Sequence, residues 1–463
     1  MPRVIGQETF DEVVRENINE FSMSPEDAVK DAILQFEAQG VDLGNIVTES
    51  LSRLSTGATE AVTSAVQRVV ALQKDPCMTK DLVGALDALR HELDKSLAHK
   101  LLAGKGGCQD VLLDLLEEED PNLAVLASAA GCLASLATGQ PDLLDGRGAD
   151  VMLRTLAAPL PSCVHAPVLE WAAQCCLKHE GNRQDLVKRG VAERLRPLLR
   201  SDAALSPSVR AACGLMRALV LDDDVRVEFG LAHEHARELA TRVLCTLVDL
   251  AKRFDDAETL NELLMTLSAL IVRNEFCGMF KDAGGLQLIK GIMEKQLQDK
   301  DLMQQCLKLL KVLAGNDDVK AAITSAGAAP LIVLAMNEHL DSAPLVGQAC
   351  GTIAALTLRS PANSKLLVEQ GVADAVLDGM RTHAKVLSVQ KQGSWAIRNI
   401  VSRDKSLGSA FLQRDAEGVL REALKRHGAV YDHEYDIKSA LRDLGCDVEL
   451  RELWTGKGKG ALN

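Results

Sequence analysis

The sequence predicts an all-α protein in which short helices stack as a right-handed superhelix, or solenoid, of three-helix repeats. The composition is 47% hydrophobic but only 3% aromatic, and alanine and leucine, which favour helices, supply much of the apolar content. A glycine-centred motif recurs along most of the chain. A helix rich in small residues follows nearly every copy of the motif, and both features are typical of repeat proteins.

The motif is an apolar residue four positions before a glycine and another apolar residue five positions after it. Successive copies lie 42 to 44 residues apart, apart from one interval of 51 residues. The marker positions are Gly106, Gly148, Gly190, His233, Gly284, Gly327, Gly371 and Asp415. A period in the forties is typical of HEAT and armadillo solenoids.

The glycine is expected because one short helix must end there and the next must begin at a sharp angle. Such a turn places the residue after the helix at positive φ, a conformation that glycine adopts without strain. Asp415 can adopt it at some cost in free energy. His233 fits the turn poorly, so a different turn is expected there.

A longer helix is predicted between the markers, in segments such as "LEWAAQCCLKHE", "VGQACGTIAALTL" and "QKQGSWAIRNIV". These segments are apolar nearly all round, as a helix packed between two neighbouring repeats must be. Three helices per repeat with the long one third favour armadillo over HEAT repeats. About eight repeats are expected over residues 81–445.

The chain outside the repeats divides into three segments. Residues 1–47 are predicted to form two helices, the second capped by Ser24, opened by Pro25 and closed by Gly40. Residues 48–80 are interpreted as a linker with one weak helix, and residues 446–463 as a C-terminal cap and a flexible tail. A solenoid groove accepts amphipathic helices, so the apolar stripe of the second helix makes that helix a candidate to fold back into the groove.

Bulk properties exclude several classes of function. A net charge of −13 disfavours sequence-independent binding to nucleic acid. The sequence contains no run of 18 apolar residues, so no membrane span is predicted. The 12 cysteines are scattered without a CxxC pair, and the first residues lack an apolar signal core. These features favour a monomer in a reducing compartment, the cytoplasm, the nucleus or both.

The repeats resemble the armadillo family over about three quarters of the chain. Blocks outside the repeat consensus, such as "ETFDEVVRENINEF" and "ALRDLGCDVELRELWTG", resemble one branch of that family. The resemblance implies an α-solenoid without an established enzymatic activity that binds other proteins, with no cofactor.

Peptide-binding armadillo proteins repeat a Trp and, four residues later, an Asn along the third helices. Here Trp395 and Asn399 form the one complete pair, and Trp171 has no Asn partner. One pair cannot hold a long strand, because each hydrogen bond contributes only about 0.5–1.5 kcal/mol. This disfavours a nuclear transport adaptor, which stays an alternative together with a co-chaperone-like peptide receptor.

One turn beyond the Asn position, the same helix face is expected to carry a row of polar residues in the C-terminal half. Arg is suited to bidentate binding of carboxylates, so this row is predicted to bind an acidic or C-terminal peptide segment. The alternative interpretation is that these residues are solvated helix ends. The candidate partner-binding residues are Trp395, Asn399, Arg398, Arg403, Arg359, Asn316, Arg273, Trp171 and His179.

Other motifs resemble chemical sites but have simpler interpretations. "HEH" at residues 233–235 and the Cys176/His179 pair lack the further ligands of a closed zinc site. "DDD" at 222–224 and "NDD" at 316–318 are expected to cap the short helices that follow them. No catalytic triad order is evident, so neither an enzyme nor a metal site is predicted.

Overall fold

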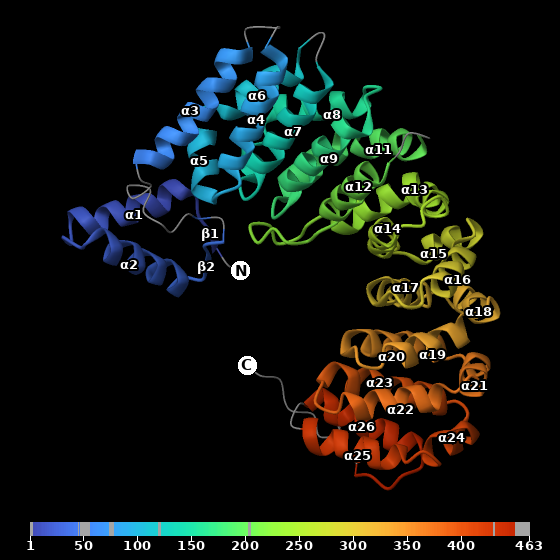
Figure 1. The fold of residues 1–463 in the computed structure, drawn as a ribbon. Coiled ribbons are helices and arrows are strands. Elements are labelled where there is room, and N and C mark those ends of the chain that lie inside the picture. The colour runs from blue at the N-terminus through green and yellow to red at the C-terminus, as the bar shows by residue number, and fades with distance from the viewer. Residues whose placement is uncertain are drawn as a thin grey trace. The chain divides into compact units, whose positions relative to one another are not determined.

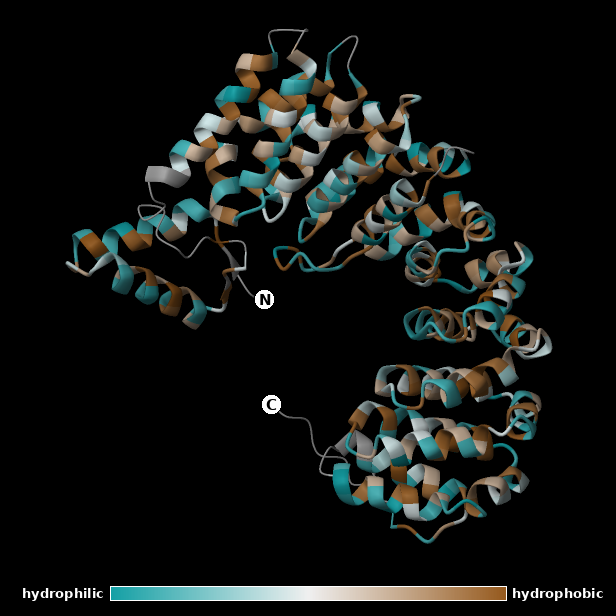
Figure 2. Cartoon of the chain, in the orientation of Figure 1, coloured by the Kyte–Doolittle hydropathy of each residue, from teal (hydrophilic) through white to brown (hydrophobic). Residues whose placement is uncertain are grey.

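The computed structural model describes residues 3–44, 46, 56–73, 78–118, 122–201, 205–428 and 431–449. These residues form two compact units, residues 1–250 and 251–463, and each unit is a stack of short helices (Figure 1). Most helices carry both hydrophobic and hydrophilic residues, as amphipathic helices packed in layers must (Figure 2). The predicted all-α class is confirmed, with one two-residue strand pair near the N-terminus.

The described residues of the first unit form two short strands and thirteen α-helices, of which the last ends at the unit boundary. The elements are β1 Arg3–Val4, α1 Gln7–Asn19, α2 Pro25–Ala38, β2 Val41–Asp42, α3 Thr56–Gln73, α4 Thr79–Leu93, α5 Leu97–Lys105, α6 Cys108–Leu116, α7 Leu123–Ala137, η3 Pro141–Leu143, α8 Gly146–Ala157, α9 Ser162–Cys176, α10 Glu180–Lys188, α11 Val191–Arg200, α12 Ser206–Leu219 and α13 Ala232–Ala251.

The described residues of the second unit form four complete three-helix repeats after one leading helix. The elements are α14 Ala257–Leu270, α15 Asn274–Asp282, α16 Gly285–Lys295, α17 Lys300–Leu313, α18 Asp317–Ser325, α19 Ala328–Glu338, α20 Ala343–Thr357, α21 Pro361–Glu369, α22 Val372–Thr382, α23 Leu387–Val401, η4 Lys405–Leu407, α24 Gly408–Leu412, α25 Ala416–His427 and α26 Tyr431–Asp443.

The predicted turn between the first two helices of a repeat is confirmed at five markers. The residues at positive φ are Gly190, Gly284, Gly327, Gly371 and Asp415, with φ between 58° and 87°. Each lies directly before the second helix of its repeat. Asp415 compensates part of its strain, because its carboxylate accepts a hydrogen bond from the Gly418 N–H and caps α25.

The predicted left-handed turn is absent at two glycine markers, Gly106 and Gly148. At His233 the turn differs, as the sequence predicts. The left-handed residue of the first repeat is Gly107 instead of Gly106. Gly148 lies inside α8, whose first turn is capped by Asp145, so the turn needs no left-handed residue there. His233 lies within the first turn of α13, and an irregular segment at residues 221–231 replaces the short first helix.

The third helices form a continuous layer in each unit. In the first unit α4 packs on α7, α7 on α9, and α9 on α12; in the second unit α14, α17, α20, α23 and α26 pack in that order. In the second unit α14, α17 and α20 lie on one side, and α15, α16, α18 and α21 lie on the other (Figure 1). Small residues allow this close contact, and 11 of the 15 residues of α20 are buried.

A histidine recurs at the end of the second helix in the last three repeats and joins neighbouring repeats. The Nε2 atoms of His339, His383 and His427 donate to the carbonyls of Leu297, Leu340 and Ala384, at 2.7, 2.8 and 2.9 Å. Each carbonyl belongs to the preceding repeat. Spaced 44 residues apart, these histidines fix the stacking of the repeats.

The N-terminal segment has its own small core. Phe10 and Phe36 lie with ring centroids 5.9 Å apart, and Ala28 and Ala32 are fully buried between the two helices. Ser24 accepts a hydrogen bond from the Asp27 N–H, which confirms the predicted cap of α2. The apolar stripe of α2 is therefore already used in packing against α1.

The predicted linker contains more structure than expected. Within residues 48–80, α3 extends over 18 residues and packs against α4. Residues 48–55 and 74–77 lie outside the described residues, as does the predicted tail from residue 450 onward.

Within the described ranges, no single helix has the length and apolar character required to cross a bilayer. The pair α18 and α19, bent by 74° at its junction, meets that criterion when the two helices are taken together.

Candidate partner-binding surface

The predicted polar row does not continue along the third helices. These helices end at Leu270, Leu313, Thr357 and Val401, so Arg273, Asn316, Arg359 and Arg403 lie in the loops that follow. Arg359 itself adopts a left-handed conformation with φ of 59°, which turns the chain away from the helix axis. The prediction that this row shares the helix face is therefore wrong.

Two of these polar residues are engaged as helix caps. Asn316 accepts hydrogen bonds from the N–H groups of Asp318 and Val319 and so caps α18, as predicted for "NDD". His179 caps α10 through its Nδ1 atom, which accepts from the Asn182 N–H at 3.0 Å. Its Nε2 atom donates to Asp142 at 2.8 Å.

The two tryptophans of the predicted groove have different environments. Trp171 on α9 is 2% exposed and belongs to the core of the first unit, so its prediction as a groove residue is wrong. Trp395 on α23 is partly exposed, and Lys391 Nζ lies 5.0 Å from its ring centroid. This cation–π contact places a positive charge over Trp395, which reaches the surface of the layer.

The neighbours of Trp395 on α23 are partly engaged within the layer. The Asn399 amide nitrogen donates to the Ala354 carbonyl of α20 at 2.9 Å, so this donor stabilises helix packing. Arg398 Nε lies 4.0 Å from Asp443 on α26, at the limit of an ion pair.

A cationic surface lies instead across the middle of the layer in the second unit. Helices α17, α20 and α23 together carry five lysines or arginines and a single acidic residue, Asp301, in a chain with a net charge of −13. Lys308 and Lys311 on α17 are exposed and Lys391 on α23 is partly exposed. The basic residues lie on α17 and α23, on either side of the uncharged α20. The flanking helix α14 carries Glu258 and Glu262 and no basic residue.

Gly351 on α20 forms the floor of this surface. A Cβ atom added at Gly351 would lie 2.9 Å from Lys311 Nζ and 2.7 Å from Gln392 Oε1. The side chains from α17 and α23 therefore converge over the glycine between them. We call the set Gln305, Lys308, Lys311, Gln348, Gly351, Lys391, Gln392 and Trp395 the lysine–glutamine face.

Sequence reasoning missed most of this face because it searched each third helix only at the positions of the Trp/Asn pair and one turn beyond. Counting charges helix by helix would have found it, since α17 and α23 are basic whereas α14 has only acidic charges. The recurrence of glutamine at 305, 348 and 392 is a second signal in the sequence.

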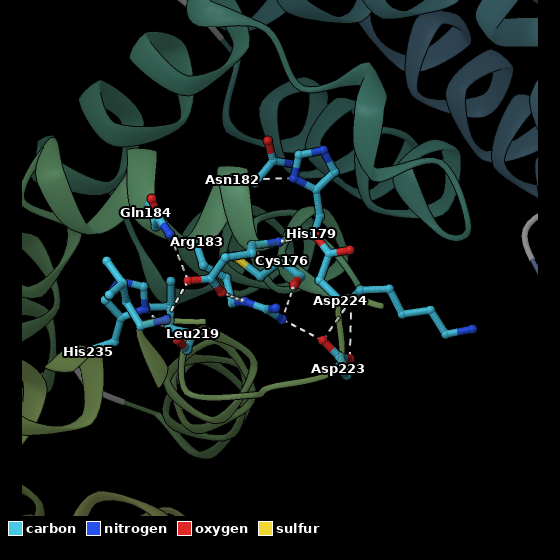
Figure 3. A network of polar contacts seen from close by, with 12 residues as sticks. Cys176, His179, Asn182, Arg183, Gln184, Leu219, Asp223, Asp224 and His235 are labelled. Atoms are coloured by element: carbon cyan, nitrogen blue, oxygen red, sulfur yellow. Dashed lines mark hydrogen bonds and ion pairs between the residues drawn. The ribbon is translucent and has the colours of Figure 1, made fainter. Parts of the chain in front are cut away.

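The first unit contains a buried ionic network of a different character (Figure 3). Arg183 is 1% exposed, and its guanidinium donates to Glu180 at 2.8 Å, to Asp223 at 2.5 Å and to the Cys176 carbonyl at 3.0 Å. Glu180 also accepts from the Leu231 N–H at 2.7 Å. The network therefore fixes both ends of the irregular segment 221–231.

The "DDD" motif belongs to this network. The prediction that it caps the helix that follows it is wrong. Asp224 accepts from the Glu180 N–H at 2.8 Å and so caps α10 of the preceding repeat. Asp223 accepts from the Lys178 N–H and from Arg183. The segment that they hold exposes Phe229, whose side chain is 81% exposed.

The network predicts a specific acid sensitivity. Burial acts to raise the pKa of Asp224, but hydrogen bonds from Arg226 and the Glu180 N–H outweigh it and lower the pKa from 3.8 to about 2. Because the folded pKa is depressed, this carboxylate stabilises the fold above pH 3.8, and the contribution is lost as the pH falls toward 2. The free energy of unfolding from urea titration should therefore differ between the wild type and Asp224→Asn by a constant amount above pH 3.8. The difference should shrink below that pH, and a difference independent of pH down to 2 would contradict the assignment.

The two motifs with metal-ligand spacing have structural roles. Burial raises the pKa of Cys176 to about 12, which keeps the thiol neutral, and His179 is engaged as a cap. In "HEH", His235 is 4% exposed, and its Nδ1 atom lies 3.1 Å from the Leu219 carbonyl. Among the described residues, no group of three or more His, Cys, Asp or Glu side chains is arranged to hold a metal ion.

Two family models match the chain. One, described as ARMC6, matches residues 59–462, and the other, described as the armadillo repeat-containing protein 6 N-terminal domain, matches residues 2–64. The chain is 41% identical to the armadillo repeat-containing protein 6 homolog of Drosophila melanogaster over 464 residues, covering 98% of both chains. It is 38% identical to armadillo repeat-containing protein 6 of Homo sapiens over 470 residues, covering 98% of this chain and 93% of the relative.

A solved structure shares the fold at low sequence identity. It comes from a study entitled "A conserved phosphorylation switch controls the interaction between cadherin and beta-catenin in vitro and in vivo". The TM-score is 0.59 at 14% identity, and the match covers 95% of this chain and 81% of the other. At this identity the likeness supports the armadillo-type architecture alone.

Proposed function

Because the chain belongs to the armadillo repeat-containing protein 6 family, we propose that it is a non-enzymatic scaffold that binds other proteins. The lysine–glutamine face of its C-terminal unit is the site that we assign to an acidic segment of a partner. This assignment keeps the acidic ligand predicted from the sequence and moves its site from the loop arginines to the lysines of α17 and α23.

The observation that carries the proposal is the local reversal of charge. Five basic residues and one acidic residue on α17, α20 and α23 stand against an overall charge of −13. Opposite charges across an interface speed the encounter of partners and exclude wrong ones. Lys311 and Gln392 converge over Gly351 at the centre of this surface, and Trp395 supplies an aromatic contact at one edge.

The same charge argues against a receptor for basic cargo. A nuclear transport adaptor needs acidic side chains beside its Asn ladder, whereas this surface is basic and the one Asn of the ladder, Asn399, donates to the Ala354 carbonyl. A co-chaperone-like peptide receptor is compatible with an acidic ligand. It would be distinguished by stable recovery of a chaperone that depends on Lys311 and Lys391.

Reversing the charge of this face should weaken binding of an acidic probe. The probe is a fluorescein-labelled peptide of three Asp-Ala-Pro units, and fluorescence anisotropy at low salt measures its affinity. In the variant Lys308→Glu/Lys311→Glu/Lys391→Glu three attractions become repulsions, so the affinity should fall at least about tenfold.

The matched control is Lys281→Glu/Lys295→Glu/Lys365→Glu, which reverses three lysines on α15, α16 and α21 of the same unit. It changes the net charge equally and should alter the affinity less than about twofold. Equal losses in the two variants would mean that the probe senses net charge alone, and the proposed site would then be wrong. A Lys-Ala-Pro peptide should not bind to the wild type.

We further propose that the protein works as a monomer in the cytoplasm, the nucleus or both. Support for a reducing compartment comes from 12 cysteines without paired spacing in the sequence. No cofactor is required for binding of this kind.

A further inference from the structure

A glutamine occupies the same position in three successive third helices of the second unit. Gln305 on α17, Gln348 on α20 and Gln392 on α23 are separated by 43 and 44 residues, the period of the repeat. Since these helices pack side by side, the three carboxamides form a row across the lysine–glutamine face. The row is distinct from the Trp/Asn positions of the same helices.

The carboxamides of this row are not satisfied by the protein. Gln305 Oε1, Gln348 Nε2 and Gln392 Oε1 are buried atoms without a hydrogen-bond partner in the part of the chain that the structure describes. The three side chains as a whole are partly exposed. Rotation about the soft terminal torsion of glutamine exchanges the two ends and lets either one reach a ligand.

A carboxamide matches a peptide group, because its N–H donates to a carbonyl while its C=O accepts from an N–H. A ligand backbone would therefore satisfy donors and acceptors that the free protein leaves unpaired. Over Gly351 the Gln392 amide and the Lys311 ammonium meet, so backbone and carboxylate recognition lie within one side-chain length of each other.

The spacing of the helices selects the conformation of the ligand. Packed helices lie about 8–10 Å apart. A polyproline II segment repeats every three residues with a rise of about 3.1 Å each, which gives about 9.3 Å per turn. A β-strand presents the same face every two residues, or about 6.6–6.8 Å, and falls out of register with the row. The polyproline II backbone makes no internal hydrogen bonds, so its polar groups are free to bind.

We propose that the glutamine row binds the backbone of an acidic segment in the polyproline II conformation, with one carboxamide for each turn. The lysines at 308, 311 and 391 take the acidic side chains. This inference rests on the proposed function and adds the conformation and register of the ligand. The segment that spans α17 to α23 is about 16–20 Å long, which corresponds to roughly six residues.

The test uses the full-length protein and the fluorescein-labelled peptide of three Asp-Ala-Pro units. The variant Gln305→Leu/Gln348→Leu/Gln392→Leu keeps the size of the side chains and all lysines but removes the amides. A second peptide is N-methylated at each Asp and each Ala, which removes the backbone N–H donors, since Pro has none, and keeps the charge. Each change should weaken binding about tenfold. The two changes together should weaken it by less than the product of their separate effects, because both act on the same amide contacts.

A floor variant provides an independent check. Gly351→Ala places a methyl group where Lys311 and Gln392 now meet, and only the ends of flexible side chains must move. This variant should lower the affinity for the peptide at least about fivefold, while the midpoint of thermal unfolding should be unchanged or higher. The matched control Gly214→Ala lies on α12, where an added Cβ meets nothing within 4 Å, and it should not alter binding.

The outcomes distinguish backbone recognition by the glutamine row from charge attraction by the lysines. Unchanged affinity for the leucine variant and for the N-methylated peptide, with loss only on lysine reversal, would overturn the row and leave the acidic site intact. If the wild type does not bind the peptide at all, both the row and the proposed acidic site are wrong. Concentration-dependent self-association that blocks the face, seen by sedimentation, would assign it to a second copy of the chain and equally overturn the inference.

Discussion

Arg183→Leu is expected to destabilise the first unit by about 3–5 kcal/mol, because it leaves the carboxylate of Glu180 buried without a counter-charge. Burial acts to raise the pKa of Glu180, but hydrogen bonds from Gln184, the Leu231 N–H and Arg183 outweigh it and lower the pKa. Without the guanidinium, the Glu180 carboxylate must either take up a proton or move out of its buried position. Either way the N–H of Leu231 and the end of segment 221–231 lose their anchor.

The measurement is thermal or urea unfolding followed by circular dichroism, with the transition of the first unit expected to move by roughly 10 °C. Arg154→Leu is the matched control, because Arg154 pairs with Glu117 at the surface and an exposed ion pair contributes far less. Adding Glu180→Gln to Arg183→Leu should recover part of the loss. Equal shifts for Arg183→Leu and Arg154→Leu would show that the buried network does not stabilise the unit.

Trp171→Ala should destabilise the first unit by about 3–5 kcal/mol, whereas Trp395→Ala should have a much smaller effect on stability. The indole of Trp171 is 2% exposed, and its removal leaves a large cavity between α8 and α9. Trp395 is partly exposed at the surface of α23. Loss of the Trp395 ring should instead lower the affinity for the acidic peptide, because Lys391 is then no longer positioned by its contact with the ring.

The pair of tryptophan variants separates core from surface with one assay for each property. Urea unfolding should report the loss at Trp171, and fluorescence anisotropy of the labelled peptide should report the loss at Trp395. Trp171→Phe, which keeps most of the buried area, should cost much less than Trp171→Ala. Comparable unfolding shifts at the two positions would contradict the environments described for them.

The repeat architecture could be predicted because its turns depend on local chemistry. At Gly190 and Gly371 the turn requires positive φ, and glycine is the residue that adopts it without strain. The same logic failed at Gly148, because the cap by Asp145 closes that turn without a left-handed residue. A local rule is reliable only where one local conformation is required.

The site was harder to predict because its parts come from different repeats. Trp171 and Trp395 occupy equivalent positions in the repeat, yet one is core and the other reaches the surface. The convergence of Lys311 and Gln392 over Gly351 involves three helices, and single-helix patterns do not reveal it. The buried network of Arg183 likewise depends on Asp223, which follows it by 40 residues.

The most direct test of the central claim, that the lysine–glutamine face binds an acidic segment, is site-specific photo-crosslinking. The photoreactive residue p-benzoylphenylalanine replaces Ala355 on α20 in one protein and Leu334 on α19, which is 49% exposed, in another. Irradiation with the labelled peptide of three Asp-Ala-Pro units should give an adduct from position 355 and none from position 334. Equal labelling at both positions, or labelling at 334 alone, would contradict the proposed site.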